Sequence, residues 1–220
     1  MTQKLRIAFY GEGNTDKRVM PIFVEKIIFE IALDAIDVIV NTQIWNGRGD
    51  FIDVCISLVR QSKPEHQMIV FHFDADGSDD ATVRRMKIDP LLKALRDNNL
   101  LNDPPIVWAV PVHAIEAWLL ASPQAFARAL TTNPNQAQEL RFPDRPDQIH
   151  RDRAKELFSE GVYKLLAKTQ RQRRRIQPSH YHEDVAEAIR LDDLRRLPAF
   201  AAFEQDLVRV LVELGYVEQS

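Results

Sequence analysis

The sequence predicts an α/β fold, with a mostly parallel sheet in the first half of the chain and helices in the second half. Short apolar runs alternate with helical patterns over the first 111 residues. The run over residues 67–73 is almost uninterrupted, as in a strand that is buried on both faces. From residue 113 onward the apolar spacing is helical. Strands that alternate with helices form parallel sheets covered on both sides by helices.

Four strands are expected, at residues 5–10, 35–44, 67–73 and 106–110. Between them the apolar spacing predicts helices over residues 19–31, 50–60 and 80–98. Asn14 or Thr15 is a suitable cap for the first helix, and Asp50 for the second. Pro21 either kinks the first helix or marks its start, and Pro90 disturbs the third.

The second half of the chain predicts helices joined by one long loop. The loop covers residues 131–149, and the helices are expected at residues 115–121, 123–130, 151–158, 162–174 and 183–194. A last helix carries a clean apolar stripe to Leu214 and stops at Gly215. We therefore predict two domains, an α/β core over residues 1–125 and a helical lobe over residues 126–220 packed on it.

Composition excludes several classes of protein. The 220 residues include 29 Lys and Arg against 32 Asp and Glu, a net charge of −3, which excludes a uniformly basic nucleic-acid coat. The single cysteine excludes an internal disulfide framework and a cysteine-based zinc cluster. No apolar run approaches the roughly 20 residues that span a bilayer, and no signal peptide is visible. We expect a cytoplasmic protein with no membrane partner.

Acidic residues follow the expected strands at the points where a ligand would bind. Glu12 lies in Gly11-Glu12-Gly13 after the first strand, and the pair Asp74 and Asp76 follows the third. Glu116 lies in the first turn of a helix after the fourth strand. In an open parallel sheet, ligands bind beyond the carboxyl ends of the strands. A helix cap or a solvated turn would explain each acid separately.

Two neighbouring carboxylates repel each other unless a cation neutralises them. Mg²⁺ prefers oxygen ligands and is held by a few carboxylates together with water and phosphate. The pair therefore predicts a Mg²⁺ or Mn²⁺ site that acts on phosphate groups.

Basic charge is concentrated in one segment. Residues 141–175 carry a net charge of +6, so the rest of the chain carries −9. The densest run includes Arg171, Arg173, Arg174 and Arg175. Such a run neutralises nucleic-acid phosphates, although a solvated helix end gives the same pattern.

Together, Gly-Glu12-Gly-Asn-Thr-Asp, Asp74-Ala-Asp76-Gly and His-Ala-Ile-Glu116-Ala-Trp resemble the motifs of the Toprim domain. The likeness is to small stand-alone bacterial Toprim-like proteins, which are akin to the nuclease domain of the overcoming-lysogenization-defect (OLD) proteins. It is strong in about the first 120 residues. Later segments, such as the one around Lys155, are similar only loosely.

The resemblance implies a Rossmann-like Toprim core and a Mg²⁺-dependent nuclease. Glu12, Asp74, Asp76 and Glu116 would hold one or two metal ions. Lys155 matches a basic catalytic residue by a weak local pattern. The four tyrosines have no context like that of a topoisomerase nucleophile, which favours hydrolysis of nucleic acid. The resemblance also implies an ATPase partner and a role in bacterial antiviral defence.

Two other function classes remain open from the sequence. The segment Phe71-His-Phe-Asp74-Ala-Asp76-Gly also fits the first motif of haloacid-dehalogenase-like phosphatases, with Asp74 as nucleophile and Asp76 as general acid. That motif normally opens its domain, whereas a strand and a helix precede it in this chain. The third class is a non-catalytic module that binds protein or nucleic acid.

Overall fold

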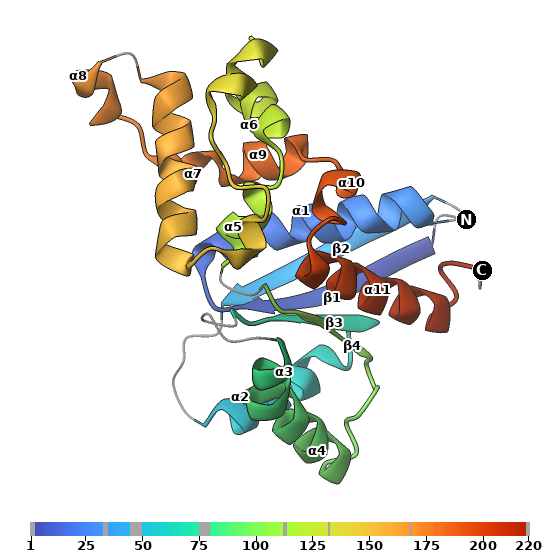
Figure 1. Ribbon diagram of the computed structural model, residues 1–220. Helices are drawn as coiled ribbons and strands as arrows, with labels where there is room; N and C mark the ends of the chain where they lie inside the picture. The colour runs from blue at the N-terminus through green and yellow to red at the C-terminus, as the bar shows by residue number, and fades with distance from the viewer. Residues whose placement is uncertain are drawn as a thin grey trace.

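A four-stranded parallel sheet forms the centre of the described part of the protein (Figure 1). The computed structural model describes residues 3–32, 35–44, 50–74, 80–111, 114–131, 133–167 and 169–218. The strands are β1 (Gln3–Gly11), β2 (Ile36–Ile44), β3 (Met68–His72) and β4 (Ile106–Ala109), in the order β2-β1-β3-β4. The predicted α/β fold class is confirmed, because all three strand pairs are parallel.

Helices cover both faces of this sheet, as the strand order requires (Figure 1). One face carries α1 (Asn14–Ile31), with α11 (Pro198–Glu213) on β4, and α5 (Ile115–Leu119) and the other later helices pack further out on this side. The other carries α2 (Phe51–Ser62) and α4 (Asp89–Asp97). Alternation along the strands explains the division, since Ile7 and Phe9 point to the first core whereas Ala8 and Tyr10 point to the second.

The second half of the chain forms a helical layer on the first face. Its helices are α6 (Pro123–Leu130), α7 (Arg151–Leu166), α8 (Gln170–Arg173), α9 (His182–Ala188), α10 (Leu191–Leu194) and α11 (Pro198–Glu213). Short 3₁₀ segments at Pro134–Glu139, Pro146–Gln148 and Pro178–Tyr181 lie between them. Phe23 of α1, Trp118 of α5 and Phe200 of α11 lie in one hydrophobic cluster, with ring centroids 5.1–6.1 Å apart.

Four predicted helices differ from the observed ones. The helices expected over residues 151–158 and 162–174 are replaced by α7, which runs unbroken through Gly161 and ends at Leu166, and by the short helix α8. Gly161 lies under Phe126 and Phe142 inside α7. The helix expected over residues 183–194 is divided into α9 and α10. Residues 80–98 contain α3 (Asp80–Val83), a π-helical turn (Arg84–Ile88) and α4, so the irregularity lies just before Pro90.

Two features of the helix ends agree with the sequence. Asp50 caps α2, since its side chain accepts bonds from the backbone N–H groups of Ile52 and Asp53. Gly215 has a φ of +79°, a left-handed conformation that ends α11. Among the described residues, no helix is both long enough and apolar enough to cross a membrane.

Candidate functional site

The carboxyl ends of β1 and β3 bring two predicted site residues to one edge of the sheet. The two strands are neighbours and run parallel, so Glu12 and Asp74 both follow them on the same edge. β4 lies on the other side of β3, and Glu116 lies in the first turn of α5 after it. Asp76 lies outside the described residues.

Two buried residues that sequence reasoning missed join this cluster. Asp16 lies in the first turn of α1, where its Oδ2 accepts a 2.8 Å hydrogen bond from the Gly13 N–H. His72 is fully buried at the end of β3, with Nδ1 3.4 Å from Asp16 Oδ2 and Nε2 3.9 Å from Asp74 Oδ1. The available signal was a histidine inside the apolar run of residues 67–73.

The acidic surroundings favour a charged His72. Burial alone would lower the pKa of the imidazole, but the charges of Asp16, Asp74 and Glu12 raise it above its ordinary value. Burial opposes ionisation of Asp16 too, yet the charge of His72 and the Gly13 N–H bring the pKa of that carboxyl below its ordinary value. Asp16 and His72 therefore form a buried ion pair beneath Asp74.

The carboxyl group of Asp74 is buried, and its hydrogen bonding is incomplete. It is 7% exposed, and its Oδ1 is buried without a hydrogen-bond partner. Burial is the main cause that raises the pKa of Asp74 to about 6, against the attraction of His72 and Arg151. The guanidinium Nη1 of Arg151, at the start of α7, lies 3.6 Å from Asp74 Oδ2. Sequence reasoning did not select Arg151.

Glu116 lies on the same side of the cluster as α7. It is 6% exposed, and burial raises the pKa of its carboxyl, while the charges of Lys155 and Arg151 act in the opposite direction. His182 Nε2 lies 3.8 Å from Glu116 Oε1, and its ring packs on Phe158 at 4.3 Å. Burial lowers the pKa of His182 to about 4, so this histidine is neutral near pH 7.

Glu12 is more accessible than the other acids. Its Oε1 accepts a 3.3 Å hydrogen bond from Lys87 Nζ on the π-helical turn. The same ammonium group lies 5.6 Å from the centre of the Phe73 ring. Lys87 therefore pairs with Glu12 from the π-helical turn before α4, on the second face of the sheet.

The carboxylate oxygens of this edge are of the kind that binds a hard cation, although the described residues alone do not form a complete metal site. Buried carboxylate oxygens, one of them unpartnered, are the ligands that Mg²⁺ or Mn²⁺ prefers. Among the described residues, no three acidic, histidine or cysteine side chains are placed so that they could hold one ion together. The chemistry of the residues therefore fits a metal, and Asp76 lies in a segment that is not described.

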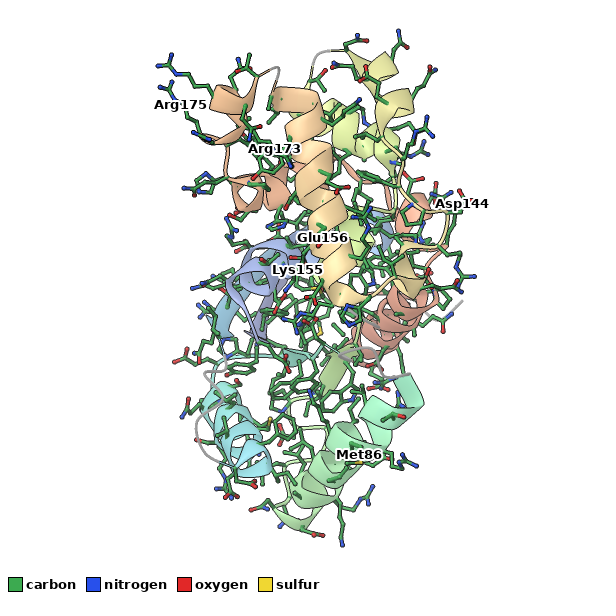
Figure 2. All side chains as sticks on the ribbon, turned by 60° about the vertical axis from the view of Figure 1, so that its left-hand side comes forward. Met86, Asp144, Lys155, Glu156, Arg173 and Arg175 are labelled. Atoms are coloured by element: carbon green, nitrogen blue, oxygen red, sulfur yellow. The ribbon has the colours of Figure 1, made fainter. Side chains whose placement is uncertain are left out.

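A polar stripe on α7 leads away from Asp74. Arg151, Lys155, Ser159 and Tyr163 repeat every four residues, so they share one face of the helix. Lys155, Ser159 and Tyr163, with Arg173 of α8, line a surface hollow of about 500 Å³. The stripe spans about 18 Å at 1.5 Å per residue. Figure 2 shows Lys155 on α7, with Arg173 and Arg175 beside the far end of the helix.

The predicted nucleic-acid contacts gather at that far end. Arg171, Arg173, Arg174 and Arg175 are all exposed. The guanidinium carbon of Arg173 lies 4.5 Å from the centre of the Tyr163 ring, which anchors α8 to α7. The run therefore borders a surface hollow that reaches Lys155, and it does not touch Asp74 directly. Glu156 and Glu160 also line the hollow, so the surface carries both signs of charge.

The model of a protein family described as "Domain of unknown function (DUF4276)" matches residues 11–208. The chain belongs to this family. The match contains Glu12, Asp74, Glu116 and Lys155. A search of curated proteins finds no significant match.

Solved structures similar to this DUF4276 chain come from two bacterial OLD proteins. The C-terminal region of the Xanthomonas campestris pv. campestris OLD protein is 17% identical, with a TM-score of 0.49 over 96% of this chain and 98% of that one. The C-terminal region of the Burkholderia pseudomallei OLD protein is 15% identical, with a TM-score of 0.48 over 94% of this chain and 98% of that one.

Proposed function

We propose that the protein is a metal-dependent nuclease of the Toprim type, which hydrolyses phosphodiesters of nucleic acid. The observation that carries the proposal is the cluster at the sheet edge. Glu12 and Asp74 follow adjacent parallel strands, Glu116 lies in the first turn of α5 after β4, and Asp74 has a buried oxygen without a partner. The resemblance of the three acidic motifs to the Toprim domain supports the same reading.

The residues divide into metal-holding and phosphate-holding groups. Glu12, Asp74, Asp76 and Glu116 would hold Mg²⁺ or Mn²⁺. When bound, such an ion polarises a phosphate and lowers the pKa of a water molecule. Arg151 and Lys155 place positive charge beside Asp74 and Glu116, where they would hold the phosphate. The Asp16–His72 ion pair fixes the position of Asp74 from below.

A cleavage assay tests this proposal. We expect the wild type to cut a labelled DNA or RNA strand with Mg²⁺ or Mn²⁺ and not with chelator. Glu12→Gln and Asp74→Asn should each lower the rate at least about a hundredfold, because each removes a charged ligand. Glu65→Gln changes an exposed acid far from the site and should leave the rate unchanged.

The same variants separate a nuclease from a phosphatase. A phosphatase with Asp74 as nucleophile would hydrolyse a small phosphomonoester, lose that activity in Asp74→Asn and keep it in Glu12→Gln. That pattern would contradict the proposal. Failure of the wild type to cut any strand with either metal would also contradict a self-sufficient nuclease. The ATPase partner and the role in antiviral defence follow from the resemblance alone and stay predictions.

A further inference from the structure

Three aromatic rings form a ladder across the sheet that ends at its β4 edge. Tyr10, Phe71 and Trp108 are register partners on β1, β3 and β4. The centroids of Tyr10 and Phe71 lie 5.3 Å apart at 29°, and those of Phe71 and Trp108 lie 5.7 Å apart at 16°. Phe71 thus covers one side of the indole. In the described structure no further strand pairs with β4, so Trp108 is the last ring of the ladder.

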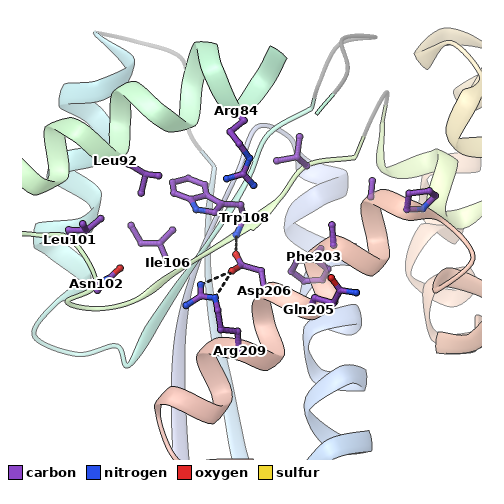
Figure 3. Close-up of a pocket in the computed structure, with 14 residues that line it drawn as sticks. Arg84, Leu92, Leu101, Asn102, Ile106, Trp108, Phe203, Gln205, Asp206 and Arg209 are labelled. Atoms are coloured by element: carbon purple, nitrogen blue, oxygen red, sulfur yellow. Dashed lines mark hydrogen bonds and ion pairs between the residues drawn. The ribbon is translucent and has the colours of Figure 1, made fainter. Parts of the chain in front are cut away.

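A pocket of about 730 Å³ begins where the ladder ends (Figure 3). Trp108, Ile106 and Leu92 form apolar walls, and Phe203 of α11 closes another side. The volume lies within the range of about 300–1,000 Å³ that is usual for small-molecule sites. A planar ring entering this pocket would extend the ladder by stacking on Trp108.

The charged groups of the pocket favour an anion. Asp206 Oδ2 accepts a 3.0 Å hydrogen bond from the backbone N–H of Trp108, and its Oδ1 pairs with Arg209 Nη2 at 2.6 Å. The one carboxylate of the lining is thus already compensated. Arg84, at the start of the π-helical turn, makes no ion pair with any described residue, and its guanidinium lies beside Trp108 in Figure 3. Its charge is therefore available to a ligand.

We infer that this pocket binds a nucleotide, with the base stacked on Trp108 and the phosphate paired with Arg84. The inference goes beyond the proposed nuclease function, because the pocket lies at the open side of β4 and contains none of Glu12, Asp74 or Glu116. Asn102 and Gln205 add amide groups, which can donate to and accept from a base edge.

A small molecule suits this edge better than a protein strand. Strand addition needs the free backbone groups of the edge strand. At Trp108 the outward N–H is already taken by Asp206, and α11 lies against β4. A second strand would have to displace both. A nucleotide needs only the ring face and the Arg84 guanidinium.

Calorimetric titration of the full chain with AMP, in chelator, tests the inference. We expect saturable binding of AMP, with weaker binding of adenosine and of ribose 5-phosphate, because each lacks one of the two contacts. Arg84→Gln should weaken AMP binding about tenfold or more, since it removes a charge-assisted contact. Arg85→Gln, at the adjacent exposed residue outside the pocket, should bind AMP like the wild type. Ala202→Trp should block binding by filling the pocket.

Three outcomes would overturn the inference. The first is absence of AMP binding to the wild type. The second is equal binding by wild type, Arg84→Gln and Ala202→Trp, with circular dichroism showing that both variants are folded. The third is binding that is lost in Lys155→Gln and kept in Arg84→Gln, which would place AMP at the candidate active site. The titration does not measure cleavage, so absence of AMP binding would not contradict the nuclease proposal. Absence of cleavage would likewise not contradict AMP binding at this pocket.

Discussion

At the scale of single residues, this protein concentrates buried charge at one edge of its sheet. Asp16, His72, Asp74 and Glu116 are all less than 9% exposed. Two of them form an ion pair, whereas Asp74 keeps an unpartnered oxygen. Buried charge without full compensation costs stability, so such a cluster is typical of a site that binds a charged ligand.

The variant Asp74→Asn should stabilise the metal-free protein at neutral pH. Burial raises the folded-state pKa of Asp74 to about 6, above its ordinary value of 3.8. The wild type therefore loses stability as the pH rises from about 4 to 6, because the folded state resists ionisation more than the unfolded state does. At pH 7.5 in chelator, the gain should reach at most about 3 kcal/mol, and at pH 4 it should fall to about 0.5 kcal/mol.

Urea unfolding at the two pH values measures this difference, and Asp97→Asn serves as an exposed control. Lower stability of Asp74→Asn at pH 7.5 would show that pairing with Arg151 and His72 outweighs the cost of burial.

At the scale of elements, Lys26 of α1 binds the carboxyl end of α9. Lys26 Nζ donates hydrogen bonds to the carbonyls of Ala186, Glu187 and Ile189, at 2.6–2.9 Å. These carbonyls lie at the end of α9, where helices leave carbonyl groups without partners. A cation at this position also matches the negative end of the helix dipole.

Lys26→Met should therefore destabilise the fold by about 2 kcal/mol, since hydrogen bonds to a charged group are each worth about 1.5–3 kcal/mol and are not additive. Lys17→Met, at an exposed position of α1, should change the free energy of unfolding by less than about 0.5 kcal/mol. Chemical denaturation compares the two variants. Equal losses would mean that Lys26 contributes only through its aliphatic chain.

Gly161→Ala tests how closely α7 packs on its neighbours. A Cβ at residue 161 would lie 2.9 Å from Phe142 Cζ and 3.0 Å from Phe126 Cε1. Alanine favours a helix by about 1 kcal/mol over glycine, but overpacking costs about 1–3 kcal/mol. Because Phe126 is fully buried, we expect a net loss of about 1 kcal/mol. Phe142→Leu in the same chain should recover part of it in a double-mutant cycle, and a stabilised single variant would contradict this account.

At the scale of the whole molecule, the fold joins an acidic sheet edge to a basic helix end. The stripe on α7 connects them, from Arg151 beside Asp74 to Tyr163 beside Arg173. A polyanion is repelled by the carboxylates until cations compensate them, so a nuclease needs positive charge elsewhere to hold its strand. The run of arginines from Arg171 to Arg175, in and after α8, is the densest positive charge in the described chain.

Changing Arg173, Arg174 and Arg175 together to Ala should weaken nucleic-acid binding irrespective of sequence. The slope of log K against log salt should flatten by about one to three units, at about 0.9 per duplex phosphate or 0.7 per single-strand phosphate. Fluorescence anisotropy across a salt series measures this slope. Metal affinity should not change, because Asp74 lies at the other end of the stripe. An unchanged slope would favour a solvated helix end or a docking patch for an acidic protein.

Side-chain patterns along the chain predicted the parallel sheet and the edge at which Glu12 and Asp74 lie. Strand periodicity and the strand-helix order predicted β1 to β4, and the rule for ligands at strand ends placed Glu12 and Asp74 together. These properties are local, because they depend on side-chain alternation and on the direction of each strand. Asp76 could not be placed, since it lies outside the described residues.

The cations near these acids, Arg151 and His72, reach them through contacts that form only in the folded chain. Arg151 meets Asp74 because α7 docks its first turn on the end of β3, a contact between residues 77 positions apart that no local pattern encodes. His72 lies in an apolar run, and only the fold places Asp16 beside it. The sequence predicted two helices where α7 runs through Gly161, and two phenylalanine rings from other segments occupy the space that a side chain at this residue would need. Packing between distant segments decides each of these features, and a sequence pattern records only neighbours along the chain.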